Sequence, residues 1–263
     1  MKYRFDSYYL DSPIVKGRIF DLFLPEGEPK DIAVFIVHGG GWRAGSRASF
    51  HFMMERLADG GYAAASADYR LDAPDAFVQL SDLREAYAAF VRLLKEKGVK
   101  PRIVVYGESA GAHLASLLSY TSPGECGEKC ALSDEWVPPV RVILQAAPVD
   151  FCPYEAMMDS TRAMMESAAG APYEKDPERY ERLSLKNYIR ESNPPTFFME
   201  AELEHLFSSE NTYAVYQRHL EFGILSQYKV YPGMEHGFLY ALTRSAQREA
   251  LSDIFKFLEG EKI

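Results

Sequence analysis

A sharp turn between an expected strand and an expected helix constrains this chain more than any other sequence feature. The apolar run 103–106 is followed by Gly-Glu-Ser-Ala-Gly at residues 107–111 and then by a helix-forming stretch that reaches Tyr120. Such a tight reversal forces strained backbone angles at the turn and requires small flanking residues. The pattern predicts that the hydroxyl of Ser109 stands at the tip of a strand, as a nucleophile would. A chance occurrence in a loop is the alternative, which the flanking elements disfavour.

Three consecutive glycines follow a second apolar run. His38, Gly39, Gly40, Gly41 and Trp42 come directly after residues 32–37. Glycine weakens regular structure by roughly 0.5–1 kcal/mol, so this run indicates a place where backbone N–H groups point at a ligand. A tetrahedral oxyanion requires two or three such donors. A phosphate-binding loop is the alternative, but the spacing matches neither common glycine pattern of nucleotide sites.

A histidine late in the chain is the expected base. His236 lies in the turn-rich segment 232–238, directly after an expected strand at 227–231. Histidine can take the proton of a serine hydroxyl near neutral pH and return it to the leaving group. The other histidines fit less well, because they lie in helical patterns, in the glycine loop or beside the candidate acid: His38, His51, His113, His205 and His219. Of these, we expect His113 to be a packing residue.

The acid that orients His236 is expected after the strand at 196–199. The segment beyond it holds Glu200, Glu202 and Glu204. The third group of a triad must lie a few residues into the loop to reach the histidine, which favours Glu204. Glu202 is the second choice, and Glu200 is assigned to the strand end.

The whole chain reads as alternating strands and helices. Two antiparallel strands open it at 3–10 and 15–24, and further strands are expected at 32–37, 63–67, 103–106, 140–144, 196–199 and 227–231. Helices are expected at 50–59, 76–97, 110–118, 211–222 and 245–258. This order predicts an α/β fold with a mostly parallel sheet and helices on both faces, in a single domain over residues 1–263. Ser109, the acid loop and His236 each follow a strand, so all three fall on one sheet edge.

Residues 150–192 depart from this alternation. The segment is rich in methionine and tyrosine, which suggests short helices that form a small lid over the catalytic edge. Methionine side chains adapt to varied acyl or alcohol groups. The alternative is that these residues only pack the insertion onto the body. Expected near the substrate are the five side chains Trp42, Tyr154, Phe207, Met234 and Phe238.

Together these motifs resemble the α/β-hydrolase carboxylesterases related to hormone-sensitive lipase and to bacterial feruloyl and acetyl esterases of the BD-FAE type. The resemblance covers most of the chain and rests on residues 38–42, 68–71, 107–115 and 231–238. The chain order serine, acid, histidine also matches that fold. The resemblance implies that the backbone amides of Gly40, Gly41 and Ala110 form the oxyanion hole. The sequence departs from the family before the acid, where Glu-Ala-Glu-Leu-Glu at 200–204 replaces His-Gly-x-x-Asp.

The expected function is therefore a serine carboxylesterase that cleaves short-chain acyl esters through an acyl-enzyme, with acetyl or feruloyl esters of carbohydrates among the candidates. An arylformamidase-like amidase and a catalytically silent hydrolase fold that binds a small ligand are the alternatives. We expect no cofactor and no metal. The partner is a small-molecule ester, acyl length and alcohol stay open, and a homo-oligomer is compatible with the sequence.

The composition argues against some classes of partner and some cellular locations. The formal net charge is −9, which argues against a nucleic-acid partner. The sequence shows neither the apolar core of a signal peptide nor a run long enough to span a membrane, so we expect the cytoplasm and no membrane association. Free thiols are therefore expected for Cys126, Cys130 and Cys152. A Cys126–Cys130 disulfide is the alternative, and a zinc site is disfavoured.

Overall fold

The computed structural model describes residues 3–11, 13–130, 132, 136–155 and 157–263. Within these ranges the strands form one eight-stranded sheet in the order β1-β2-β4-β3-β5-β6-β7-β8. Their bounds are β1 Tyr3–Tyr9, β2 Ile19–Pro25, β3 Ile32–Val37, β4 Ala63–Ala67, β5 Arg102–Glu108, β6 Arg141–Gln145, β7 Thr196–Leu203 and β8 Gln227–Glu235. β2 runs antiparallel to β1 and β4, and all pairs from β4 to β8 are parallel. The expected α/β fold with a mostly parallel sheet is confirmed.

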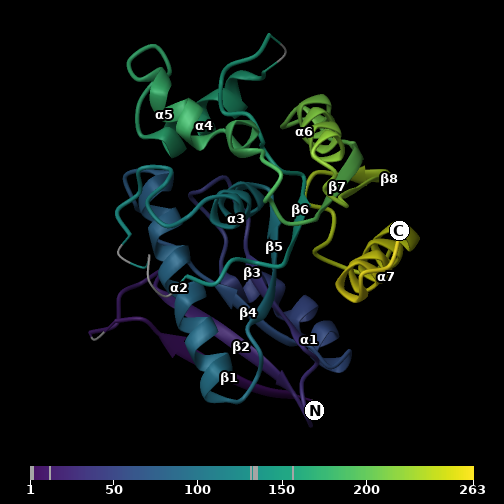
Figure 1. The fold of residues 1–263 in the computed structure, drawn as a ribbon. Helices are drawn as coiled ribbons and strands as arrows, with labels where there is room; N and C mark the ends of the chain where they lie inside the picture. Colours follow the sequence, from purple (N-terminus) through teal and green to yellow (C-terminus); the bar gives the residue numbers. More distant parts are fainter. Residues whose placement is uncertain (1–2, 12, 131, 133–135, 156) are drawn as a thin grey trace.

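Helices cover both faces of this sheet (Figure 1). α1 (His51–Asp59) and α7 (Ser245–Glu259) pack on one face, and α2 (Ala76–Glu96), α3 (Ala110–Tyr120) and α6 (Ser209–Glu221) pack on the other. The insertion contributes α4 (Asp159–Ala169), α5 (Pro177–Leu183) and the short 3-10 helix η3 (Leu185–Tyr188), while η1 (Arg47–Phe50) precedes α1. No helix in the described ranges combines the length and the apolar character that a membrane crossing needs.

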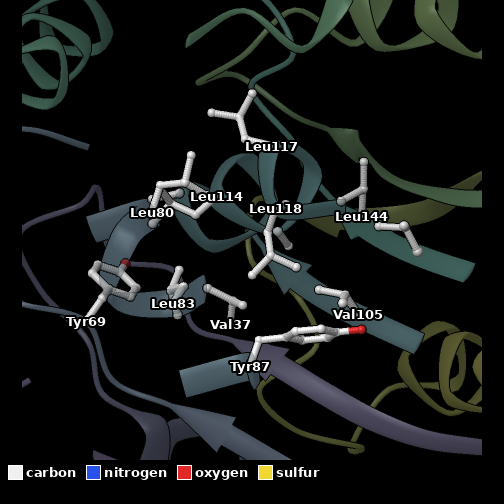
Figure 2. Close-up of a cluster of buried hydrophobic side chains, with 14 of the residues drawn as sticks. Val37, Tyr69, Leu80, Leu83, Tyr87, Val105, Leu114, Leu117, Leu118 and Leu144 are labelled. Atoms are coloured by element: carbon white, nitrogen blue, oxygen red, sulfur yellow. The ribbon is translucent and has the colours of Figure 1, made fainter. Parts of the chain in front are cut away.

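The central strands are apolar throughout because both faces of the sheet are buried. In β5, Ile103 and Val105 join the core under α2 and α3, whereas Val104 and Tyr106 join the core under α1 and α7. Figure 2 shows the first of these cores, in which side chains of α2 and α3 meet those of β3, β5 and β6. Each fully buried aliphatic side chain contributes roughly 1.5–3 kcal/mol. The short apolar runs of the sequence thus become the rigid centre of the molecule.

α3 is buried on all sides. Every residue from Ala110 to Tyr120 is in the interior, and the polar side chains of His113, Ser116 and Ser119 are hydrogen bonded to backbone carbonyls there. Its N-terminus directly follows β5, so the helix and the strand together fix the position of Ser109. The nucleophile candidate therefore stands between a central strand and a fully buried helix.

The last two strands are longer than the sequence indicates. β7 extends to Leu203 and β8 to Glu235, and these two residues pair with each other beyond an irregularity in the ladder. Pro232 is tolerated inside β8 because that strand is at the edge of the sheet, where a missing N–H leaves no neighbour unpaired. The expected strand ends at 199 and 231 are therefore wrong, and the loops after β7 and β8 begin later than expected.

Candidate active site

Ser109 occupies the strained turn that its flanking glycines predict. Its backbone has φ 54° and ψ −124°, a left-handed conformation that is uncommon outside glycine. A Cβ on Gly107 would overlap the backbone of Gly111 and Ala112, and a Cβ on Gly111 would overlap the carbonyl oxygens of Val37 and His38. These two glycines are therefore required by close backbone approach, which lets β5 turn into α3 against the end of β3.

The structure brings three predicted residues into one hydrogen-bonded chain. The Ser109 Oγ lies 2.7 Å from Nε2 of His236, and Nδ1 of the same ring lies 2.7 Å from Oε2 of Glu204. A carboxylate accepts, so Nδ1–H donates to Glu204 and leaves Nε2 to accept the serine proton. This is the arrangement in which a histidine can act as base toward a hydroxyl.

The second oxygen of Glu204 is held by the backbone. Oε1 accepts from the N–H groups of His205 at 3.0 Å, Leu206 at 2.8 Å and Phe207 at 3.3 Å. Burial raises the pKa of this carboxyl, but the hydrogen bonds and the charge of His236, together with the backbone donors, outweigh burial and lower the pKa overall. Glu204 is therefore kept ionised and fixed in direction.

The two other glutamates of the segment lie inside β7 and do not reach His236. Oε2 of Glu202 accepts from the Gly233 N–H at 2.7 Å, which ties β7 to β8. Glu200 is 1% exposed, and burial raises its pKa, which favours its neutral form. Within this segment, only Glu204 is bonded to the histidine.

The glycine loop is shaped by its lack of side chains. Gly40 has φ 112° and Gly41 φ 56°, and the Gly40 carbonyl accepts from the N–H groups of Arg43 and Ala44. Among the described residues, no acceptor takes a hydrogen bond from the Gly40 or Gly41 amide. Ala110 is the first residue of α3, where N–H groups are not used within the helix. These three amides are therefore available to an oxyanion.

A residue that the sequence reading did not single out also faces His236. Glu108 is 2% exposed, its Oε1 lies 3.9 Å from Nε2 of His236, and its Oε2 accepts from the Tyr240 hydroxyl. Burial raises its pKa, against the lowering effect of the Tyr240 hydrogen bond and the His236 charge. The sequence signal that could have pointed to Glu108 is its charge, because it stands directly before Ser109 in a turn of otherwise small residues.

Three of the five expected pocket side chains are packed elsewhere. Met234 and Phe238 lie in the core under α7, at 4% and 8% exposure. The Trp42 indole is fully buried, and its N–H donates to Nδ1 of His113 at 3.2 Å. Each of these three side chains packs in a core, and its expected contact with the substrate stays a prediction.

The other two lie beside the acid loop. The Phe207 ring is centred 5.5 Å from the ring of His236. Burial raises the pKa of the half-buried Tyr154 phenol, against a hydrogen bond with the backbone of Ser208, which places it by the same loop. Phe207 and Tyr154 therefore remain the candidates for substrate contact.

His113 has the packing role expected of it. Its Nδ1 accepts from Trp42, and its Nε2–H donates to the Leu183 carbonyl at 2.8 Å. Burial lowers its pKa to about 4, so the ring is neutral. It thereby joins the glycine loop, α3 and α5 from within the core.

The insertion is fastened on both sides of the site. Thr161 of α4 donates to the Leu206 carbonyl of the acid loop at 3.0 Å, and Arg43 of the glycine loop donates to the Ser167 carbonyl at 2.7 Å. The Sδ of Met164 lies 3.2 Å from where a Cβ of Gly41 would stand. Met157 and Met165 are buried, so methionines of the insertion serve both the body and the site.

The three cysteines are free thiols, as expected. Burial raises the pKa of Cys152 to about 11, which leaves it protonated and unreactive at neutral pH. In the described ranges, no cluster of three His, Cys, Asp or Glu side chains is arranged to hold a metal ion.

Comparisons with known proteins identify the family and the fold. The BD-FAE family model matches residues 20–218. An arylacetamide deacetylase of Oryctolagus cuniculus is 34% identical over 107 residues, which are 37% of this chain and 27% of that protein. The chain thus matches about a quarter of the length of that relative.

Solved structures share the fold along almost the whole chain. An esterase of Thermogutta terrifontis with propionate bound has a TM-score of 0.76 and 22% identity, covering 97% of this chain and 93% of that one. A truncated carbohydrate esterase from gut microbiota has a TM-score of 0.80 and 17% identity, covering 98% and 96%. The chain belongs to the BD-FAE family.

Proposed function

We propose that this protein is a carboxylesterase for short-chain acyl esters, with Ser109 as nucleophile, His236 as base and Glu204 as the acid. The observation that carries the proposal is the pair of 2.7 Å contacts that link Ser109 to His236 and His236 to Glu204. The strained backbone of Ser109 supports it, because strain of this kind is found at sites where function requires it.

The chemistry follows from these positions. His236 takes the Ser109 proton as the oxygen attacks the ester carbonyl, and the amides of Gly40, Gly41 and Ala110 receive the developing oxyanion. The resulting imidazolium is stabilised by Glu204 and protonates the departing alcohol, which leaves an acyl-serine. Water then enters, gives its proton to His236 and releases the carboxylic acid, and Ser109 recovers its proton.

Short acyl groups are favoured by the surroundings of the glycine loop. Met164 covers Gly41, so the space beside one proposed oxyanion donor is limited. The related Thermogutta esterase holds propionate, and another relative in fold is a carbohydrate esterase. We therefore place acetyl esters, including those of carbohydrates, first among the substrates.

A panel of p-nitrophenyl esters from acetate to dodecanoate, run beside acetylated xylan, tests the proposal. We expect acetate to butyrate esters to be cleaved fastest. Ser109→Ala and His236→Ala should each remove activity. The matched variant His205→Ala should retain it, because the His205 ring is exposed and, among the described residues, is bonded only to the Leu203 carbonyl. Full activity of Ser109→Ala would refute the assignment.

Amide hydrolysis is the second candidate, and the arylacetamide deacetylase relative is the observation that favours it. The same site can cleave an amide, because His236 would protonate an amine as it does an alcohol. Acetanilide and N-formylkynurenine therefore belong in the panel. A higher kcat/KM for either amide than for the acetate ester would show that the protein prefers amide substrates.

A further inference from the structure

A groove of about 470 Å³ lies outside the candidate active site, between α5, the start of α2 and the loop 127–129. Figure 1 shows α5 with α4 beyond one end of α2. Four cationic side chains line the groove, and they come from separate parts of the chain: Arg70, Lys129, Arg179 and Arg182. Its volume is within the range of small-molecule sites.

Half of these charges are already neutralised. Arg179 pairs with Asp75 at 2.6 Å, and Arg70 pairs at 2.6 Å with the buried Asp82. The one further carboxylate at the groove, Glu128, is fully buried and bonded to Arg84 at 2.5 Å. No acidic side chain of the groove is therefore left for the remaining two cations.

Arg182 is held in place, and no carboxylate in the described ranges forms an ion pair with it. Its guanidinium lies 4.8 Å from the centre of the Phe77 ring, and its Nε is buried with no acceptor among the described residues. The Nη1 lies 2.7 Å from where a Cβ of Gly127 would stand, so the glycine leaves the room that this side chain occupies. A positioned guanidinium with an orphaned donor is an incomplete hydrogen-bonding arrangement.

Lys129 adds a second uncompensated charge. It is exposed, and within the described ranges no carboxylate forms an ion pair with it. Two unpaired cations at one groove stand out in a chain whose formal net charge is −9. They match the charge of a phosphate monoester, and a planar guanidinium suits phosphate oxygens by bidentate hydrogen bonding.

We propose that this groove is a binding site for the phosphate group of a small phosphorylated molecule, with Arg182 and Lys129 as its main contacts. The ligand would join α5 of the insertion to the loop 127–129. The site is separate from Ser109 and does not depend on the proposed esterase activity.

Calorimetric titration of the full chain with inorganic phosphate at pH 7.5 tests the proposal, with chloride at matched ionic strength as the reference. We expect saturable binding of phosphate only. Arg182→Gln and Lys129→Gln should each weaken it at least fivefold. The matched control Arg218→Gln, an exposed arginine of α6 paired with Glu221, should leave it unchanged.

Lys129→Gln removes an exposed side chain, so its result stands even where Arg182→Gln alters the packing on Phe77. Absence of saturable phosphate binding to the unmodified chain would overturn the proposal. The proposal would also be overturned if Lys129→Gln bound phosphate as tightly as the unmodified chain and a folded Arg182→Gln variant did so too.

Discussion

Glu204 differs from the neighbouring glutamates in what its two oxygens accept. One receives the His236 N–H and the other receives backbone N–H groups, whereas Glu202 holds only Gly233. Glu204→Gln keeps the shape but presents an amide to Nδ1, which disfavours the required tautomer. We expect kcat to fall by about 10³–10⁴, as an equivalent change does in a serine protease triad.

Glu202→Gln is the matched control for that change. It keeps an oxygen for the Gly233 N–H and touches no catalytic group, so we expect kcat within about threefold of the unmodified enzyme. Ester hydrolysis at saturating substrate measures both variants. A larger loss in Glu202→Gln than in Glu204→Gln would transfer the acid role to Glu202.

At the scale of elements, the turn from β5 to α3 depends on space more than on backbone angle. A Cβ on Gly111 would overlap the carbonyl oxygens at the end of β3, whereas Gly98 has φ 74° but nothing within 4 Å. Gly98→Ala should therefore cost about 1 kcal/mol, from backbone strain alone. Gly111→Ala should cost about 3 kcal/mol or more, because β3 and α3 must separate. Denaturant unfolding compares them, and equal costs would contradict this account.

The contact of α4 with the glycine loop predicts a change in acyl preference. Met164→Ala removes the side chain that lies against Gly41 and should raise kcat/KM for hexanoate relative to acetate esters several-fold. Met158→Ala, which truncates a methionine that is 39% exposed, is the matched control and should leave the ratio unchanged. The ester panel measures both. An unchanged ratio in Met164→Ala would place the acyl group away from α4.

The elements that could be predicted from sequence are those whose burial leaves a continuous apolar run. β3 and β5 are of this kind, and the residues that follow them include the glycine loop and Ser109. The ends of β7 and β8 could not be predicted, because β7 continues through Glu200 and Glu202 and β8 continues through Pro232 and Gly233, residue types that are uncommon in strands. The orientation of the Met234 side chain could not be predicted either, because it depends on which face of β8 the side chain projects from.

At the scale of the whole molecule, two buried histidines connect separate elements. His113 joins the glycine loop to α5, and His219 of α6 is hydrogen bonded to Tyr120 at 3.0 Å and Ser226 at 2.8 Å. Burial lowers the pKa of each to about 4. Both rings are therefore neutral parts of the core, and protonating them opposes folding.

This makes stability depend on pH with a definite sign. The unfolded histidines titrate at 6.5 and the folded ones at about 4, so between these values the unfolded chain binds more protons. The contribution is complete above pH 6.5 and is lost as the pH falls toward 4. Glu108 and Glu200 act in the opposite direction above pH 4.5, because burial raises their pKa values and the native state then holds the extra protons.

Comparison with a variant isolates the histidines from those glutamates. The double variant His113→Gln/His219→Gln retains groups that donate and accept but do not titrate. Between pH 6 and 5, the free energy of unfolding of the unmodified protein should fall by about 2 kcal/mol more than that of the double variant, since each of the two sites contributes at most about 1.4 kcal/mol per pH unit. Urea unfolding at fixed pH values measures the slopes, with the exposed His205→Gln as control. Parallel slopes for the unmodified protein and the double variant would mean that the buried rings accept protons without opening the core.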